Sequence, residues 1–201
     1  MTTRLVLASN NAKKAAELHA MLAPLDIEII AQAELGVSEA EEPHLTFVEN
    51  ALAKARHAAA ATGLPALADD SGLCVDALGG APGVQSARFV GEPKSDARNN
   101  ARLLEALAGF PDPEQRRAYF CSVLVLVRHA EDPLPLIADG QWHGEILLAA
   151  RGEGGFGYDP LFWVPGREQT APELDAKRKG TLSHRAAAMR HLLARLQSQP
   201  L

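Results

Sequence analysis

Apolar and polar positions along the chain predict helices that alternate with strands in the first half of the sequence. Between residues 12 and 22, apolar side chains recur at about 3.6-residue spacing, which is typical of a helix with one buried face. Thr46 and Glu49 form a capping-box pattern at the start of a second helix, and Gly63 stands where its C-terminal cap is expected. The short apolar runs around these helices predict strands at Arg4–Ala8, Asp26–Ala31 and Pro65–Asp69.

The second half of the sequence is richer in strand patterns. Ser95 and Gly109 bracket a predicted helix over Asp96–Ala108, and Ser183 precedes another over His184–Gln197. Strands are predicted at Tyr119–Val127, Leu134–Ala138, Trp142–Ala149 and Leu161–Val164. Early alternation followed by a strand-rich region predicts an α/β fold, a three-layer domain with a mixed sheet.

Length and composition narrow the classes of protein that fit. The chain has 201 residues and no repeat or linker-like stretch, so we predict one domain over residues 1–201. Lysine and arginine number 20 and aspartate and glutamate 25, which gives a net charge of −5 and argues against a nucleic-acid partner. The apolar runs are shorter than the ~20 residues that span a membrane, and the N-terminal residues lack a secretory layout. Cys74 and Cys121 have no paired spacing. We therefore expect a cytoplasmic protein with no membrane partner.

The first candidate site follows the first predicted strand and opens the first predicted helix. Backbone N–H groups at a helix start, small polar side chains and lysines are typical of a phosphate-binding site. The residues concerned are Ala8, Ser9, Asn10, Asn11, Ala12 and Lys13. The alternative is an asparagine that only caps a surface helix, which is a common arrangement.

The second candidate site is Asp69-Asp70-Ser71-Gly72, directly after a predicted buried strand. Adjacent carboxylates on a strand point to opposite faces, so at most one of them is expected to enter a shared site. A carboxylate there suits Mg²⁺ or the activation of water, whereas the alternative is an ordinary Asp-Ser-Gly turn. The acidic loop Glu39–Glu42 could supply a second carboxylate, although such runs are usually solvated surface.

The other two candidates are a glycine-rich loop and a basic cluster. Gly152–Gly157 formally matches a dinucleotide-binding pattern, but it runs into an aromatic strand and does not open a helix, so we reject that interpretation. Phe156 in this loop could stack on a nucleobase or belong to the core. Lys177–Lys179 and the His184-Arg185 pair could attract an anion, or they could be solvated surface.

Six motifs, in order and spread over nearly the whole chain, resemble the inosine/xanthosine triphosphate pyrophosphatase (ITPase) family. They are Ser9–Lys13, Thr46–Asn50, Asp69–Leu73, Ala77–Gly83, Phe156–Pro160 and Ser183–Arg185. The resemblance is to bacterial members in particular, through Ser86–Phe89 and the helix that begins at Asp96. The first motif reads Ala8-Ser9-Asn10 where many members have Thr-Gly-Asn.

The resemblance implies an elongated mixed sheet with two α/β lobes, a nucleotide cleft between the lobes and a homodimer. It also implies Mg²⁺-dependent hydrolysis of the purine nucleoside triphosphates ITP, dITP and XTP to the monophosphate and pyrophosphate. Carried over by position, Glu42 and Asp70 would bind Mg²⁺, and Asp70 would also accept a proton. The substrate would be bound by Ala8–Lys13, Lys54, Ser71, Phe156, Gly157, Tyr158, Asp159, Lys179, His184 and Arg185.

Two alternative functions remain open at this point. One is a nucleotide-binding module without catalysis, which would not need paired carboxylates for a metal. The other is a pyrophosphatase for another base, as in Maf-type proteins that share the fold.

For the 6-keto purines, Arg185 and His184 would donate to the carbonyl at C6, where adenine presents an amino group. We therefore expect the protein to hydrolyse ATP poorly. Guanine shares the carbonyl at C6, so its exclusion requires a further group in the site.

Overall fold

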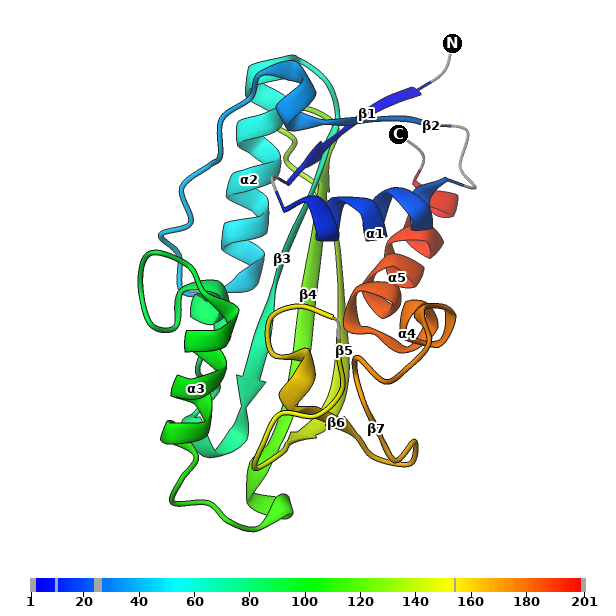
Figure 1. Cartoon of the computed structure of the whole chain (residues 1–201). Helices are drawn as coiled ribbons and strands as arrows, with labels where there is room; N and C mark the ends of the chain where they lie inside the picture. The colour runs from blue at the N-terminus through cyan, green and yellow to red at the C-terminus, as the bar shows by residue number, and fades with distance from the viewer. Residues whose placement is uncertain (1–2, 10, 24–26, 154, 200–201) are drawn as a thin grey trace. The chain divides into compact units, whose positions relative to one another are not determined.

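The computed structural model describes residues 3–9, 11–23, 27–153 and 155–199, and its strands form one seven-stranded sheet in the order β2-β1-β3-β4-β5-β6-β7 (Figure 1). Strand β1 is parallel to β2 and β3, whereas β6 is antiparallel to β5 and β7, so the sheet is mixed as predicted. The strands are β1 (Thr3–Ala8), β2 (Ile27–Ala31), β3 (Ala66–Val75), β4 (Arg117–Val127), β5 (Leu136–Ile146), β6 (Phe162–Val164) and β7 (Gln169–Thr170). The helices are α1 (Ala12–Leu22), α2 (Phe47–Thr62), α3 (Asp96–Ala106), α4 (Ala176–Leu182) and α5 (His184–Ser198).

The chain divides into two compact units that are interleaved in the sequence. The first unit contains residues 1–70, 122–140 and 185–201, and the second contains residues 71–121 and 141–184. Strands β3, β4 and β5 each contribute residues to both units. No linker therefore separates the units along the chain. Among the described residues, no helix is long and apolar enough to cross a membrane.

The first unit has three layers. Leu5 and Leu7 of β1 and Leu67 of β3 belong to one apolar core with Leu18 of α1 and Leu192 of α5. Because side chains alternate along a strand, the residues between these leucines face the other side of the sheet. Helix α2 contacts β1 and buries a row of alanines: Ala51, Ala55, Ala58 and Ala59. Such small side chains let α2 lie close to the sheet, and the predicted three-layer architecture is confirmed.

The second unit has its own core. Leu103 and Leu107, at the C-terminal end of α3, pack with Leu73 of β3, Phe120 of β4 and Phe162 of β6. The rings of Phe120 and Phe162 lie 4.6 Å apart between centroids, a normal distance for packed aromatic pairs. Strand β5 permits this packing at Gly144, where a Cβ atom would collide with the ring of Phe162.

Four elements differ from the sequence-based expectation. Strand β3 does not end at Asp69 but continues to Val75, so Asp69-Asp70-Ser71-Gly72 is strand and not a turn. The two strands predicted at 134–138 and 142–149 are one strand, β5, because burial alternates without a break through Asp139-Gly140. Helix α4 and the short strand β7 were not predicted, since their apolar content is too low to produce a periodic pattern.

Candidate active site

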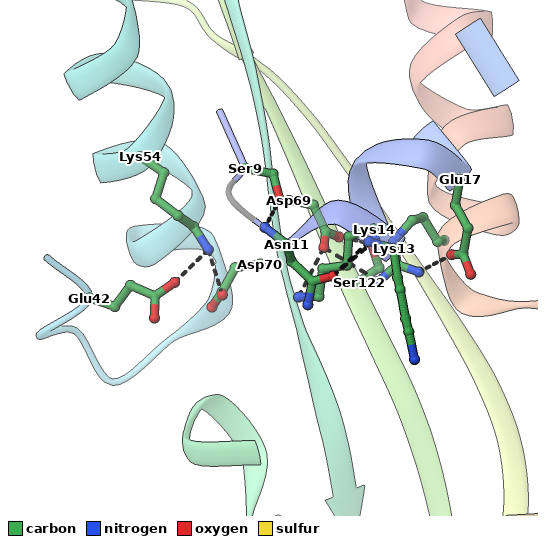
Figure 2. Close-up of polar contacts among 11 residues, drawn as sticks. Ser9, Asn11, Lys13, Lys14, Glu17, Glu42, Lys54, Asp69, Asp70 and Ser122 are labelled. Atoms are coloured by element: carbon green, nitrogen blue, oxygen red, sulfur yellow. Dashed lines mark hydrogen bonds and ion pairs between the residues drawn. The ribbon is translucent and has the colours of Figure 1, made fainter. Parts of the chain in front are cut away.

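Asp69 and Asp70 lie at the centre of a charged cluster in the first unit (Figure 2). Both are buried, with 3% and 7% of their surface exposed. Successive residues of β3 point to opposite faces of the sheet. Asp69 lies on the same face as Leu67, and α1 and α5 cover that face. Asp70 points to the opposite face, where it accepts a hydrogen bond from Lys54 of α2. The two carboxylates therefore find different partners.

Described residues of β4, α1 and α5 hold Asp69. Its Oδ1 accepts a hydrogen bond of 2.6 Å from the Ser122 hydroxyl of β4, and its Oδ2 lies 3.3 Å from Lys14 Nζ and 3.5 Å from Arg185 Nη2. Burial by itself would raise the pKa of the Asp69 carboxyl. The charges of Arg185 and Lys14 and the Ser122 hydroxyl outweigh burial and hold this pKa well below its usual range. Asp69 is consequently an ionised structural anchor.

Arg185 is the largest fully buried side chain of the protein's described residues, with 1% of its surface exposed. Its Nη1 donates to Glu17 of α1, and its Nη2 approaches Asp69 of β3. Burial disfavours the charged guanidinium, but the two acids raise its pKa further above its ordinary value. Arg185 thus joins α1, β3 and α5, and the structure places its guanidinium against two carboxylates.

The start of α1 is built as a capped helix N-terminus. Asn11 Oδ1 accepts hydrogen bonds of 3.1 Å from the backbone N–H groups of both Lys13 and Lys14, and Ser9 Oγ accepts from Asn11 N at 3.3 Å. Asn11 is therefore the asparagine that caps this helix. Ala8 is buried at the end of β1, Ala12 opens α1, and Asn10 lies outside the described residues.

Lys14, which sequence reasoning missed, is the lysine of α1 that reaches Asp69, whereas the Lys13 side chain is exposed (Figure 2). The sequence does indicate that Lys14 lies on the buried face of its helix. Lys14 precedes Leu18 by four positions and Leu22 by eight, so it stands on the buried face of α1. Glu17 was missed too, although it follows Lys14 by three positions on nearly the same face.

Asp70 faces Lys54 and Glu42. Lys54 Nζ donates hydrogen bonds of 2.8 Å to Asp70 Oδ1 and to Glu42 Oε1, so a single ammonium bridges the two carboxylates. Burial raises the pKa of Asp70, and the nearby Lys54 charge offsets this only in part. The other oxygen of Asp70, Oδ2, is buried, and within the described part of the chain it has no hydrogen-bond partner.

Glu42 and Asp70 supply the oxygen ligands that Mg²⁺ prefers. Within the described parts of the chain, no group of three or more His, Cys, Asp and Glu side chains could hold a metal ion. Mg²⁺ nevertheless usually binds through one or two carboxylates together with substrate phosphates. Asp70 Oδ2, which is buried and unbonded among the described residues, is suited to bind such an ion. Glu39 and Glu41 are exposed, and it is Glu42 that reaches the cluster.

The predicted base-binding loop Phe156–Asp159 belongs to the second unit, where it is held on several sides. Asp159 is buried, and its Oδ2 accepts hydrogen bonds of 2.5 Å from Lys179 Nζ and 3.0 Å from Phe156 N. Gly155 has a φ of +72°, and a Cβ atom there would collide with Asp159, so only glycine fits. The loop therefore has a fixed conformation.

Two residues of α3 that sequence reasoning missed also hold this loop. Asp96 Oδ2 accepts from Gly157 N at 2.7 Å, and Asn100 Nδ2 donates to Gly157 O at 2.8 Å. Tyr158 is buried and donates to Ser86 O at 2.8 Å, so its ring belongs to the core of the second unit.

The remaining predicted residues of the second unit lie on three elements. Phe156 is half-buried, with Lys179 Nζ of α4 5.4 Å from its ring centroid. His184 is buried and stacks on Phe120 at 5.1 Å between centroids. Ser71 is half-buried on β3, immediately after Asp70.

The family model of the Ham1 family matches residues 5–195. This chain belongs to the Ham1 family. The resemblance inferred from the six motifs is thereby confirmed. Among curated proteins, the dITP/XTP pyrophosphatase of Aromatoleum aromaticum is 72% identical over 201 residues, 100% of both chains. The dITP/XTP pyrophosphatase of Ralstonia nicotianae is 60% identical over 197 residues and 96% of each chain.

Solved structures of Ham1 relatives are similar over almost the whole chain. A HAM1 protein from Coxiella burnetii has a TM-score of 0.91 and 48% identity, with 98% of this chain and 99% of that chain covered. A nucleoside-triphosphatase, dITP/XTP pyrophosphatase, from Mycobacterium abscessus has a TM-score of 0.73 and 39% identity, with 99% and 100% covered. Both likenesses agree with the mixed sheet described above.

Proposed function

We propose that this protein is a hydrolase that removes non-standard purine nucleotides from the nucleotide pool. It converts dITP, ITP and XTP to the monophosphate and pyrophosphate in a Mg²⁺-dependent reaction. The observation that carries the proposal is the buried Asp70 oxygen, which no described residue hydrogen-bonds, beside Glu42 and Lys54. It occurs in a Ham1 chain whose relatives carry the name dITP/XTP pyrophosphatase.

The triphosphate would be bound by cations of the first unit. A triphosphate carries about four negative charges, and a capped helix start with adjacent lysines offsets them. Lys14 and Lys54 are held by carboxylates at 3.3 and 2.8 Å, which keeps their ammonium groups in place before the substrate arrives. We assign the main phosphate contact on α1 to Lys14 rather than Lys13, because Lys14 is the partly buried one.

Glu42 and Asp70 would hold Mg²⁺, which supplies charge compensation for the phosphates during bond cleavage. Asp70 would accept the proton of the attacking water. Its raised pKa suits this role, because a base with a higher pKa takes up a proton more readily than an ordinary carboxylate. Attack at the α-phosphorus makes pyrophosphate the leaving group, so no covalent protein nucleophile is required.

The base would be bound by the second unit. Asp96 and Asn100 bind the backbone of Gly157, and Lys179 binds the Asp159 carboxylate, which holds the loop Phe156–Asp159 in place. A 6-keto purine presents an acceptor at C6, which suits a donor such as His184, whereas the amino group of adenine would face that donor unpaired. A homodimer and a cytoplasmic location, both expected from the sequence, complete the proposal. Light scattering during size-exclusion chromatography tests the dimer.

The deciding experiment is a panel of nucleoside triphosphates with and without Mg²⁺. We expect dITP, ITP and XTP to release pyrophosphate and the monophosphate only when Mg²⁺ is present, and ATP to react far more slowly. In heavy-oxygen water, the label should enter the monophosphate. Release of orthophosphate and a diphosphate would assign the protein to another reaction class, and binding without turnover would make it a nucleotide-binding module.

A further inference from the structure

Lys54 occupies an unusual position, because it is bonded to both carboxylates that the proposed function assigns to the metal. Its Nζ lies 2.8 Å from Glu42 Oε1 and 2.8 Å from Asp70 Oδ1, and all three residues belong to the first unit (Figure 2). Only 14% of the Lys54 side chain is exposed. The ammonium is therefore a largely desolvated counter-ion of the pair, and not a surface cation that solvent screens.

The charges of these three groups do not balance. Two carboxylates and one ammonium sum to −2 + 1 = −1, and the bonds from Lys54 use only one oxygen of Asp70. The second oxygen, Asp70 Oδ2, is buried and has no hydrogen-bond partner among the residues that the structure describes. A divalent cation would neutralise both carboxylates in full, but its charge would then lie close to that of Lys54. Because like charges in a partly buried site repel strongly, the two cations compete for the same pair of acids.

We propose that Lys54 is an exchangeable counter-cation of the Glu42–Asp70 pair. In the nucleotide-free protein it holds the two carboxylates together and lowers their affinity for a divalent cation. When a triphosphate binds, its charge draws the ammonium away, which the flexible four-carbon stem of lysine allows. The proposal rests on the proposed function, and it adds an order of events: the free protein binds Mg²⁺ weakly, and metal and nucleotide enter together.

This coupling is reciprocal. If release of Lys54 by the nucleotide raises the affinity for the metal, then the metal raises the affinity for the nucleotide by the same factor. If Lys54 had only a structural role, its removal would loosen Glu42 and Asp70 and weaken any metal site. If Lys54 competes with the metal ion, its removal strengthens metal binding instead.

The test measures binding of Mn²⁺ alone, as a probe for Mg²⁺, from the loss of the free-ion signal in electron paramagnetic resonance. The full-length wild type is compared with Lys54→Met, without nucleotide. We expect Lys54→Met to bind Mn²⁺ at least about tenfold more tightly than the wild type, and Lys54→Met/Asp70→Asn to lose this gain. Arg56→Gln is the matched control, since Arg56 is exposed on the same helix and carries the same charge.

Circular dichroism verifies that each variant is folded. Equal Mn²⁺ affinities for the wild type and Lys54→Met would overturn the proposal, as would a gain of the same size in Arg56→Gln or one that survives Asp70→Asn. Pyrophosphate release by the wild type is measured on the same preparation. If the wild type releases pyrophosphate but the Mn²⁺ affinities are equal, only the competition between Lys54 and the metal is contradicted. If the wild type releases no pyrophosphate, the proposed function is contradicted.

Discussion

Asp69 and Asp70 are neighbours in the chain, yet their carboxylates meet different lysines on opposite faces of β3. Asp69 Oδ2 lies 3.3 Å from Lys14 Nζ of α1, whereas Asp70 Oδ1 lies 2.8 Å from Lys54 Nζ of α2. The pKa of Asp69 is lowered by its partners and that of Asp70 is raised by burial. The fold thus favours the charged form of one aspartate and disfavours the charged form of the next.

Asp70→Asn should abolish most activity without loss of stability. The amide cannot accept a proton and binds Mg²⁺ poorly, so turnover of dITP should fall at least ~10²-fold, the scale of a missing general base. Because burial disfavours the charge of Asp70 and Lys54 keeps Glu42 as its partner, the neutral isostere should not lower the urea midpoint of unfolding. Near-normal turnover by a folded Asp70→Asn protein would contradict the assignment.

Asp69→Asn should have the reverse effect on stability. It leaves Lys14 and the buried Arg185 without their shared carboxylate, and breaking a buried ion pair from one side costs about 3–5 kcal/mol. Urea denaturation of both variants under the same conditions provides the comparison. An Asp69→Asn protein as stable as Asp70→Asn would show that the two environments do not differ as described.

The contribution of Asp69 should also depend on pH. Its pKa is lower in the folded protein than in the unfolded chain, where it is about 4, so the unfolded chain takes up the proton first on acidification. The stabilisation is fully present above about pH 5 and is lost as the pH falls toward the lowered folded value. The difference in unfolding free energy between wild type and Asp69→Asn should therefore shrink below about pH 5. A constant difference down to about pH 3 would contradict this.

Lys14 and Lys13 form a matched pair on α1. Lys14→Met removes a cation aimed at the cluster, and loss of one charge-assisted phosphate contact should lower kcat/KM for dITP roughly ten- to hundredfold. Lys13→Met removes the same charge from an exposed side chain and should cost less than about threefold. Steady-state kinetics of both variants would decide between them. A larger loss for Lys13→Met would restore the assignment made from the sequence.

Arg185→Ala should lower kcat/KM by similar factors for nucleotides of different bases. The guanidinium is buried between Glu17 and Asp69, so its loss should disturb the anchor of Lys14 more than the choice of base. We expect similar losses of kcat/KM for dITP, dATP and dGTP. If only the dITP/dATP ratio collapses, Arg185 reads the carbonyl at C6 after all. Glu17→Gln, a milder change in the same contact, covers the case in which Arg185→Ala does not fold.

Local patterns in the sequence were sufficient for the order of helices and strands. The helix start predicted at Thr46 is capped, with the Thr46 hydroxyl accepting from Glu49 N and donating to Glu49 Oε2, and Gly63 ends α2 in the left-handed conformation. These features depend on residues within one turn of each other. Strand ends were harder to predict: β3 continues through Asp69-Asp70-Ser71-Gly72 because neighbouring strands and buried partners outweigh the turn preference of these residues.

The sequence alone determined the family and the motifs that carry the charged residues, because both depend on residue identity and order. The tertiary structure decided which charged side chains form ion pairs with each other. Period-two alternation could separate Asp69 from Asp70, but only the packing of α1, α2 and α5 assigned Lys14 and Arg185 to one and Lys54 to the other. These partners are distant in sequence, since Asp69 and Arg185 are 116 positions apart. An ion pair depends on the distance between two groups in space, and local sequence patterns do not specify that distance.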